Sequence, residues 1–409
     1  MYAAGDGATD IPPAMAPDDA MAFTANLVTS TRTITAAGTL AIIQPLLLDY
    51  DIHGYADHTP VGMASIRAIE VFRGMPRSGY FNLGKGFGID SALASGFMEA
   101  IEMCTIEQAP QVPVLAAGAL APDSCVYSAA SNAMLRAGQL GDRRVIAGVD
   151  LLTSMPVHGL VDDYFLPDND RGETLHVSTN GLASGNTLAE ARLHALYELI
   201  ERHVTAASLH ALRQVMALVL EDVPAPLRDT LAELAAGGWS AEFFLLGVTL
   251  EVPVIQCVLA PSARGSQACV DGLDLSFGWG ADHSLATALA RALAEAVQGW
   301  AIRAACMAGV IPASRMPGGL LVAQTQLLRI KTGTHAGEKT LHARLRACSR
   351  KTVSLAVDVT STAPADALEQ LLRSAGAADI AHALSWTLSP SQRPFAVVRC
   401  VMPHLVKTA

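Results

Sequence analysis

The sequence predicts a mixed α/β (α+β) protein in which mixed sheets are covered by helices. Three observations support this class. Helical patterns alternate with short β-branched runs, 51% of the 409 residues are hydrophobic against 16% charged, and no break in composition marks a linker. The composition implies a large buried core. We therefore expect a single domain over residues 26–409, after a disordered segment, 1–25, that is rich in Pro, Asp and Ala.

Five short runs rich in β-branched residues are predicted to form strands with at least one buried face. In chain order they are 112–120, 143–152, 252–260, 351–359 and 393–402. Segments with helical periodicity lie around them. These segments are 34–48, 91–108, 124–138, 187–218, 226–236, 284–308 and 365–374. The string LEDVPAPLRD (220–229) is predicted to be a turn between two helices.

The segment SGNTLAEARLHALYELIER (184–202) predicts a helix with an unusual polar stripe. The residues that share this stripe, at steps of three and four, are Thr187, Glu190, His194, Glu198 and Glu201. Their neighbours are almost all apolar. Two carboxylates three residues apart at an effective dielectric near 20 repel by about 3 kcal/mol. A bound cation or a cationic side chain would relieve this repulsion, and so would a solvent-exposed helix edge with Arg202 as partner.

The same design occurs in two other segments, GKGFGIDSALASGFMEAIE (84–102) and GADHSLATALARALAEAVQ (280–298). The residues in register with Glu198 and Glu201 are Glu99 and Glu102 in the first segment and Glu295 and Gln298 in the second. The three units lie too far apart in the chain for a solenoid repeat. We expect the three helices to converge on one site, although Ala, Leu and Glu are also simply good helix formers.

The starts of these helices favour a phosphate ligand. They begin at small or polar residues, namely Lys85-Gly86, Ser184-Gly185-Asn186 and Asp282-His283. A helix N-terminus offers free N–H groups to phosphate, and Mg²⁺ prefers carboxylate, water and phosphate oxygens. Neither GxxxxGK[ST] nor a GxGxxG between strand and helix is present. The pattern therefore predicts a nucleotide–magnesium site outside the usual phosphate-loop motifs.

Charge and cysteine usage restrict the function classes. A net charge of −10 without a basic cluster argues against a nucleic-acid surface. No apolar run reaches the ~18 residues that would span a bilayer. The seven scattered cysteines form no CxxC pair, which is typical of reduced thiols in a cytoplasmic protein. Cys104 stands two residues after Glu102, and we expect it to be a small buried residue.

With these segments in view, the chain resembles the YcaO family, which activates peptide backbone amides with ATP. The segment 84–102 resembles the family's GKG-x5-A-x-A-S-x3-E-x2-E motif. STNGLASGNTLAEARLHALYELIER resembles NG-x-A-x-GN-x3-EA-x3-AL-x-E-x2-ER, and GWGADHSLATALARALAEAVQ is similar to G-x-G-x-H-x8-RAL-x-EA-x-Q. Weaker similarity in TRTITAAGTLAIIQPLL and RPFAVVRCVMP extends the resemblance over roughly 30–405. It implies a YcaO-type fold with ATP and Mg²⁺ as cofactors.

The resemblance also implies roles for individual residues. The implied metal ligands are Glu99, Glu102, Glu198 and Glu201. The implied nucleotide contacts are Lys85, Ser95, Glu99, Glu102, Asn186, Glu190, Arg202, Arg291, Glu295 and Gln298, with Arg32 as a further phosphate contact. Glu198, Glu201 and Arg202 are the implied catalytic residues, and Arg202 would face phosphate. His194 would either assist proton transfer or be structural.

Three features depart from the family pattern. Gly299 and Trp300 follow Gln298 where the family usually continues Ser-Arg, so Arg303 would have to supply the missing cation. Asp282 precedes the family's His where Ala is common. The C-terminal string VMPHLVKTA lacks a PxPxP tail, which favours members that work beside a TfuA protein or form thioamides. No fused E1-like or leader-binding domain precedes residue 30, so we expect a partner or a short cleft to recognise the peptide.

The predicted function is ATP- and Mg²⁺-dependent O-phosphorylation of backbone amides in ribosomally made peptides. Azoline-forming cyclodehydration of Cys, Ser or Thr is placed slightly ahead of thioamidation with external sulfide. Two alternatives stay open: a non-catalytic nucleotide- or peptide-binding partner, and a metal-dependent hydrolase that needs no ATP. The expected partners are a precursor peptide and a TfuA-like or E1-like protein, in the cytoplasm, with neither nucleic acid nor membrane. A homodimer is compatible with the sequence.

Overall fold

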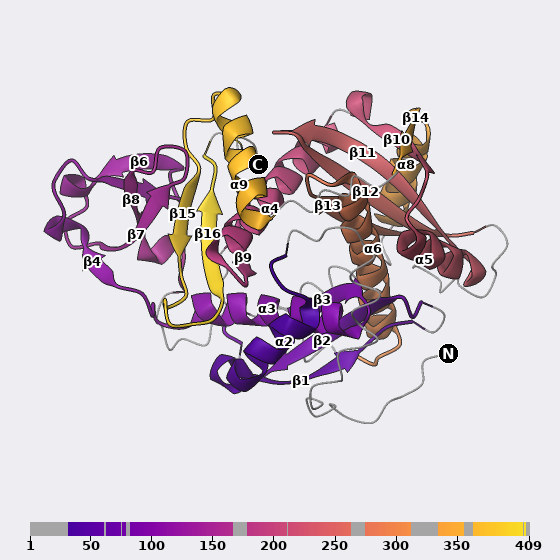
Figure 1. Cartoon of the computed structure of the whole chain (residues 1–409), viewed down its shortest axis with the longest axis horizontal. Coiled ribbons are helices and arrows are strands. Elements are labelled where there is room, and N and C mark those ends of the chain that lie inside the picture. The colour runs from indigo at the N-terminus through magenta and orange to yellow at the C-terminus, as the bar shows by residue number, and fades with distance from the viewer. Residues whose placement is uncertain are drawn as a thin grey trace.

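The computed structural model describes residues 32–60, 63–74, 76–78, 82–166, 178–210, 212–262, 275–311, 334–355, 363–403 and 405. Over these residues the chain forms three sheets with helices between and around them (Figure 1). This arrangement confirms the predicted mixed α/β class. The predicted disordered segment, 1–25, lies outside the described residues. None of the described helices is long and apolar enough to span a bilayer.

The first sheet is an antiparallel meander of β1 (Ile52–Asp57), β2 (Ile66–Arg73) and β3 (Asn82–Phe87). It follows α2 (Ala36–Ile43) and the 3-10 helix η1 (Gln44–Tyr50). The Thr35 hydroxyl caps α2 by accepting a hydrogen bond from the Gly38 N–H at 3.1 Å. α3 (Ile89–Glu107) leaves the edge strand β3.

The second sheet has the strand order β6-β5-β8-β7-β15-β16-β9, and β4 pairs with β7 beside this path. Its strands are β4 (Val114–Ala116), β5 (Cys125–Ser128), β6 (Ala133–Arg136), β7 (Arg144–Asp150), β8 (Pro156–Leu160), β9 (Leu182–Gly185), β15 (Leu384–Thr387) and β16 (Ala396–Val401). β5 and β8 run parallel, and the other pairs are antiparallel. Short 3-10 turns, η2 (Ala117–Ala119), η3 (Ala137–Gln139) and η4 (Val161–Asp163), connect the strands.

The third sheet has the order β13-β12-β11-β10-β14, with a parallel pair between β10 and β14. Its strands are β10 (Met216–Glu221), β11 (Trp239–Thr249), β12 (Val252–Pro261), β13 (Ser276–Ala281) and β14 (Ser349–Ser354). The remaining helical elements are α4 (Leu188–His210), η5 (Leu212–Gln214), α5 (Ala225–Ala236), α6 (Leu285–Met307), α8 (Thr334–Arg346) and α9 (Pro364–Ala377).

Three of the predictions of secondary structure were wrong. The segment 124–138 is not a helix but the β5–β6 hairpin, whose turn includes Asn132 in the left-handed region (φ 48°). The helix predicted over 187–218 ends at His210, and the apolar run after it forms β10. The turn at 220–229 joins the strand β10 to α5 and does not join two helices. In the first two cases strand pairing overrides the local helix propensity of Ala, Leu and Met.

The three acidic helices α3, α4 and α6 each follow directly on an edge strand: β3, β9 and β13 respectively. Glycines on these strands let the helix backbone lie against the strand. A Cβ atom at Gly84 would come within 2.0 Å of the Ala92 carbonyl oxygen, and one at Gly280 within 2.2 Å of the Ala288 carbonyl oxygen. Lys85-Gly86 and Ser184-Gly185, where we expected helix starts, lie on the strands β3 and β9, whereas Asp282-His283 stands directly before α6 as expected.

Each acidic helix forms a strand–helix unit with the edge strand before it. Each of these helices also contacts a strand that belongs to another sheet (Figure 1). α3 packs on β2 and β3 of the first sheet and touches β9 of the second. α4 packs on β9 and β16 and contacts β11, β12 and β13 of the third sheet. α6 packs on β12 and β13 and contacts β2 and β3 of the first. The three strand–helix units thus close in a ring, which brings the helices together in the middle of the molecule.

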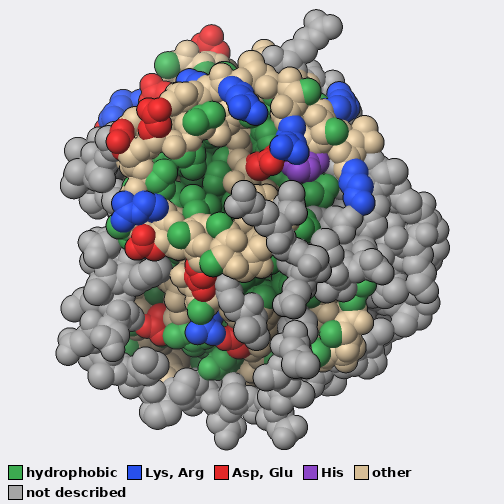
Figure 2. Space-filling view, turned by 90° about the vertical axis from the view of Figure 1, so that its right-hand side faces the viewer, with side chains coloured by type: hydrophobic (Ala, Val, Ile, Leu, Met, Phe, Trp, Pro, Cys, Tyr) green, Lys and Arg blue, Asp and Glu red, His purple; other side chains and the backbone are tan. Residues whose placement is uncertain are grey.

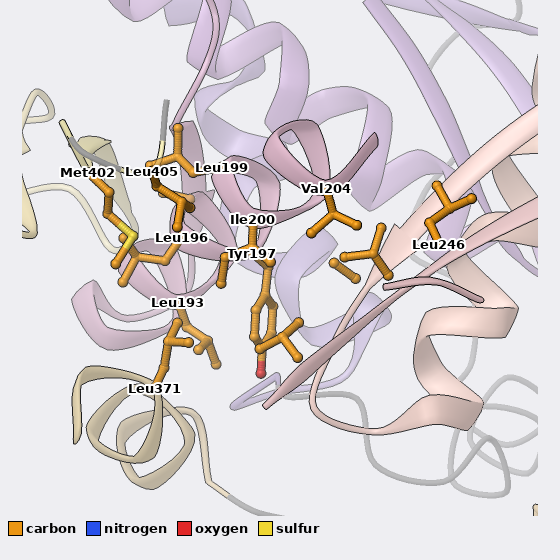
Figure 3. Close-up of a cluster of buried hydrophobic side chains, with 14 of the residues drawn as sticks. Leu193, Leu196, Tyr197, Leu199, Ile200, Val204, Leu246, Leu371, Met402 and Leu405 are labelled. Carbon is orange, nitrogen blue, oxygen red and sulfur yellow. The ribbon is translucent and has the colours of Figure 1, made fainter. Parts of the chain in front are cut away.

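The apolar side of α4 explains why this helix carries so many hydrophobic residues. Figure 3 shows its leucines and Tyr197 in a core that also receives Leu371 from α9 and Met402 from the chain after β16. Leu196 and Ile200 are fully buried. Complete burial of such a side chain is worth about 1.5–3 kcal/mol. The helix is therefore held by its apolar side, and its polar stripe faces α3 and α6.

One outer face of the molecule, at the right of Figure 1, carries a hollow with apolar side chains at its bottom and charged side chains at its rim (Figure 2). Some large apolar side chains of the described residues are exposed elsewhere, among them Leu48 (72%) and Met155 (63%). Scattered exposed residues of this kind are normal on a protein surface.

Candidate nucleotide and magnesium site

Carboxylates from all three acidic helices meet where α3, α4 and α6 converge. They are Glu99 and Glu102 on α3, Glu198 and Glu201 on α4, and Glu295 on α6. All five are half-buried. Burial raises the pKa of Glu99 to about 7, and the charges of Glu198 and Glu295 add to this rise. A hydrogen bond from the Leu83 N–H and the charge of Lys85 act in the opposite direction.

The pKa values of two other carboxyls show the same crowding. Burial raises the pKa of Glu102 to about 8, and the neighbouring charges of Glu99 and Glu198 contribute, although the Ser184 hydroxyl donates to Glu102 at 2.5 Å. Burial also raises the pKa of Glu201 to about 7, together with the charge of Glu295. Burial first, and repulsion between the carboxylates second, therefore disfavour the ionised forms of this cluster.

Two basic side chains form ion pairs with this cluster. Lys85 on β3 pairs with Glu295, and Arg202 pairs with Glu198 one turn earlier on α4. Arg202 also donates to the Asn180 side chain and is half exposed. Burial still raises the pKa of Glu198 despite Arg202. Arg202 therefore lies at the cluster, where it contacts Glu198 and Asn180, and its predicted role of facing phosphate stays a prediction.

His194 lies on the acidic stripe between two arginines. Its Nε2 accepts from Arg291 at 2.8 Å, and Arg32 lies 3.4 Å from Nδ1. Burial lowers the His194 pKa well below its usual range, and both positive charges lower it further. The imidazole is therefore neutral near pH 7 and a weak base. This environment favours the structural role over proton transfer, because the ring holds Arg291 in place.

Glu190 is enclosed by a network of its own at the start of α4. Arg32 and Asn186 donate to its Oε1 at 2.8 and 3.0 Å, and Thr33 donates to Oε2 through its N–H at 3.0 Å and its hydroxyl at 2.8 Å. Burial would raise the pKa of Glu190, but the Arg32 charge and these hydrogen bonds lower it. The Thr39 hydroxyl donates to the side-chain oxygen Oδ1 of Asn186 at 3.0 Å. Arg32, Asn186 and Glu190 thus act as one unit, and Thr33 is a member that sequence reasoning missed.

The remaining predicted nucleotide contacts lie on the same helices. Ser95 stands four residues before Glu99 on α3 and is half-buried. Gln298 stands three residues after Glu295 on α6 and is 9% exposed. Ser184 on β9 also belongs to the site because it donates to Glu102, a contact that sequence reasoning missed. Its place in the string Ser184-Gly185-Asn186 of the second motif was the available signal.

Most of the departures from the family pattern lie away from the carboxylates. Trp300 is buried on the other side of α6, where it packs edge-on against Trp239 at a centroid distance of 4.9 Å. Arg303 donates to the backbone oxygens of Gly299 and Leu275, so the expectation that it supplies a cation to the site gains no support. Asp282 accepts from the Ser284 N–H at 2.9 Å, at the start of α6.

The surroundings of His283 and Cys104 favour a structural role for both residues. The Tyr197 hydroxyl lies 2.6 Å from Nδ1 of His283, and the two rings meet edge-on. Burial lowers the His283 pKa. Cys104 is buried, as expected, and burial raises the pKa of its thiol to about 11. A thiol with such a pKa stays protonated and is a poor nucleophile.

The residues present fit Mg²⁺ bound together with phosphate. In the described part of the chain no three His, Cys, Asp or Glu side chains are arranged to hold a metal ion by themselves. Mg²⁺ does not require such a cage, because it usually keeps water and phosphate oxygens and uses one or two carboxylates. Burial, with added repulsion between neighbouring carboxylates, raises the pKa values of Glu99, Glu102 and Glu201 and so disfavours their ionised forms. A divalent cation would stabilise these ionised forms.

A comparison with known protein families identifies the family of this chain. The family described as "YcaO cyclodehydratase, ATP- and Mg²⁺-binding" matches residues 83–406. These residues include all three strand–helix units. The chain belongs to the YcaO family of ATP- and Mg²⁺-binding enzymes, so the predicted family and the predicted cofactors are confirmed.

Relatives in sequence are themselves without an assigned activity. An uncharacterized protein in the tfuA 3′ region of Rhizobium leguminosarum bv. trifolii is 28% identical over 65% of this chain. An uncharacterized protein of Mycobacterium tuberculosis is 26% identical over 63% of it. The matches span 66% and 58% of these two relatives.

Solved structures show that the fold is shared. YcaO from Methanopyrus kandleri, bound with AMPPCP and Mg²⁺, is 20% identical, with a TM-score of 0.65 over 92% of this chain and 93% of that one. A heterocyclase in complex with substrate and cofactor gives a TM-score of 0.64 at 17% identity, covering 91% of this chain and 52% of that one. A microcin synthetase complex from Escherichia coli gives 0.53 at 13% identity, covering 86% and 88%.

Proposed function

We propose that this protein uses Mg·ATP to phosphorylate a backbone amide oxygen of a peptide substrate. The observation that carries this proposal is the cluster of five half-buried carboxylates at the meeting point of α3, α4 and α6. Burial and repulsion between carboxylates raise the pKa values of Glu99, Glu102 and Glu201, and a bound cation would stabilise their ionised forms. Family membership supports ATP and Mg²⁺ as the ligands.

Different residues of the chain would then bind the metal ion, the phosphates and the rest of the nucleotide. Glu99, Glu102, Glu198 and Glu201 would hold Mg²⁺, and Lys85, Arg202 and Arg291 would lie around the phosphates. Bound Mg·ATP would supply the phosphoryl group, and its Mg²⁺ would offset negative charge on the carboxylates and the phosphates. The basic side chains stabilise charge on the transferred group. Ser95, Asn186, Glu190 and Gln298 would contact the nucleotide.

The enzyme needs no nucleophile of its own for this reaction. A Cys, Ser or Thr side chain of the substrate, or an external sulfide, adds to the backbone carbonyl. The resulting oxyanion takes the γ-phosphoryl group, and phosphate then leaves with the former amide oxygen. The protonated thiol of Cys104 and the depressed pKa of His194 are consistent with this division of roles.

The product is either an azoline or a thioamide, and we place azoline formation slightly ahead. The fold shared with a heterocyclase and a microcin synthetase complex supports this order. The relative from the tfuA 3′ region supports a TfuA-like partner. An E1-like or leader-binding partner is the alternative. The substrate in either case is a precursor peptide.

One experiment decides between these outcomes. The purified protein is incubated with the proteins encoded by neighbouring genes, a precursor peptide, Mg·ATP and sulfide. The mass of the peptide is then measured by mass spectrometry. Loss of one water marks an azoline, and exchange of oxygen for sulfur marks a thioamide. An unchanged mass with every partner present would favour the non-catalytic binding role. Turnover without ATP would favour a metal-dependent hydrolase.

A further inference from the structure

Arg399 on β16 is a buried arginine whose hydrogen-bonding capacity is only partly used. It is 3% exposed, and its Nη1 donates to the Asn180 carbonyl oxygen at 2.7 Å. Its Nε and Nη2 atoms are buried and have no hydrogen-bond partner. An unmet buried donor of a charged group is costly. Two such donors on one guanidinium therefore mark a place where an acceptor, an anion or water, would be bound.

The hydroxyl of Tyr164 is a third unpartnered donor close by. Tyr164 is 1% exposed, and its ring packs on Trp386 at a centroid distance of 4.8 Å. Trp386 stands directly opposite Arg399 in the β15–β16 pair. Gly159 lies directly against this ring, because a Cβ at that position would come within 2.4 Å of Cε2 of Tyr164. Burial raises the pKa of Tyr164 well above its usual range, so the hydroxyl keeps its proton to donate.

These donors adjoin the acidic site. Burial lowers the pKa of Arg399 and the Glu198 carboxylate acts against this, while Arg399 in turn lowers the pKa of Glu198. Asn180 accepts from Arg399 through its carbonyl and from Arg202 through its side chain. A continuous series of contacts therefore leads from Arg399 to the ion pair between Arg202 and Glu198.

The unused Nε and Nη2 atoms form one edge of the guanidinium, a planar fork that matches two oxygens of a phosphate. We propose that Arg399 and Tyr164 form a subsite for a phosphoryl oxyanion beside the carboxylate cluster. This inference rests on the ATP-dependent function proposed above. Two sources share the chemistry: the terminal phosphate of the bound nucleotide and the inorganic phosphate that the reaction releases.

The first test is the binding of inorganic phosphate, measured by calorimetry and by the rise in Tm of the full chain. Arg399→Lys keeps the charge but removes the fork, and Tyr164→Phe removes a hydroxyl that has no partner in the ligand-free protein. We expect each variant to lose about tenfold in phosphate affinity, the equivalent of one charge-assisted hydrogen bond. Tyr164→Phe removes no existing hydrogen bond, so it should fold at least as stably as the wild type.

Two variants serve as matched controls. Tyr127 also packs on Trp386, but its hydroxyl donates to Asn132 at 2.7 Å. Arg192 is a half-buried arginine that donates to the Ser385 hydroxyl. Tyr127→Phe and Arg192→Lys should keep wild-type phosphate affinity. Equal affinity of wild type, Arg399→Lys and Tyr164→Phe for phosphate would overturn the proposal, and so would equal stabilisation of the wild type by acetate.

The source of the phosphate is decided with Mg·AMPPCP and Mg·ADP. If Arg399→Lys and Tyr164→Phe lose affinity for Mg·AMPPCP but not for Mg·ADP, the terminal phosphate of the nucleotide lies in the subsite. Unchanged affinity for both nucleotides, with weaker phosphate binding, assigns the subsite to released phosphate. An equal loss for ADP would contradict the inference, because the whole nucleotide site would then have changed. If the wild type bound phosphate but not Mg·AMPPCP, the proposed function would fail and the subsite would stand.

Discussion

Lys85 on β3 and Glu295 on α6 form an ion pair although 210 residues separate them in sequence. The pair joins the first strand–helix unit to the third at the point where the carboxylates meet. The charge of Lys85 also lowers the pKa values of Glu99 and Glu201, which burial raises. One lysine thus acts on carboxylates from all three acidic helices.

We expect Lys85→Met to destabilise the ligand-free protein by only about 0–1 kcal/mol, because both partners are roughly one-third exposed. The larger effect is expected on the carboxylates, whose pKa values should rise further without the lysine. Chemical denaturation of Lys85→Met, Glu295→Met and the double variant measures the coupling energy. A coupling energy of several kcal/mol would show that the pair is primarily structural.

Glu198→Gln and Glu201→Gln should each weaken Mg·ATP binding or turnover roughly tenfold or more, since a contact to a charged group is worth about 1.5–3 kcal/mol. Both variants should remain folded. Ligand-free stability should hold or rise, because a neutral amide removes repulsion within the cluster. Glu369→Gln, at an exposed ion pair on α9, is the control and should change neither property. Wild-type ATP consumption in both cluster variants would contradict the site assignment.

The stability that Glu99, Glu102 and Glu201 contribute to the ligand-free protein should fall as the pH rises from about 5 to 8. The pKa values of Glu99 and Glu201 are raised to about 7 and that of Glu102 to about 8, so the folded state binds more protons than the unfolded state over this range. Their contribution to stability then decreases with pH. Thermal melts across this range, with Glu102→Gln as a variant of smaller slope, provide the measurement. Saturating Mg·ATP should reduce this pH-dependent contribution, and a Glu102→Gln variant with the same pH dependence as the wild type between pH 5 and 8 would contradict the assignment of Glu102.

Gly84→Ala and Gly280→Ala should destabilise the protein by about 1–3 kcal/mol or more, because overpacking forces the helix away from its strand. The clash in each case is with a backbone carbonyl oxygen at 2.0–2.2 Å, which no side-chain movement relieves. Gly376, in α9, has no atom within 4 Å of an added Cβ. Gly376→Ala should therefore be neutral or stabilising by about 0.5–1 kcal/mol. Urea denaturation compares the three variants, and equal stability of all of them would refute the strand–helix packing.

The positions of the acidic helices could be predicted from sequence because the spacing of Glu99, Glu198 and their partners is a local property. The strands before them could not, because β9 has only four residues and the GKG string on β3 has no β-branched residue. Glycine there reflects a close helix contact, which depends on tertiary structure. The ring formed by the three units likewise depends on contacts between distant segments.

For some residues, the sequence contained little indication of where they lie relative to the site. Arg399 lies in the weakly similar string RPFAVVRCVMP, and only its burial and unused donors single it out. Thr33 becomes relevant through its two hydrogen bonds to Glu190. The role of Trp300 could not be judged from the motif either, because the packing against Trp239 depends on the third sheet.

The most direct test of the proposed reaction follows an oxygen atom. A precursor peptide labelled with heavy oxygen at its backbone amides is incubated with the protein, its partner proteins and Mg·ATP, and the released phosphate is analysed by mass. The proposed O-phosphorylation predicts that the phosphate carries the label, one atom for each azoline or thioamide formed. Unlabelled phosphate accompanying a modified peptide would contradict it.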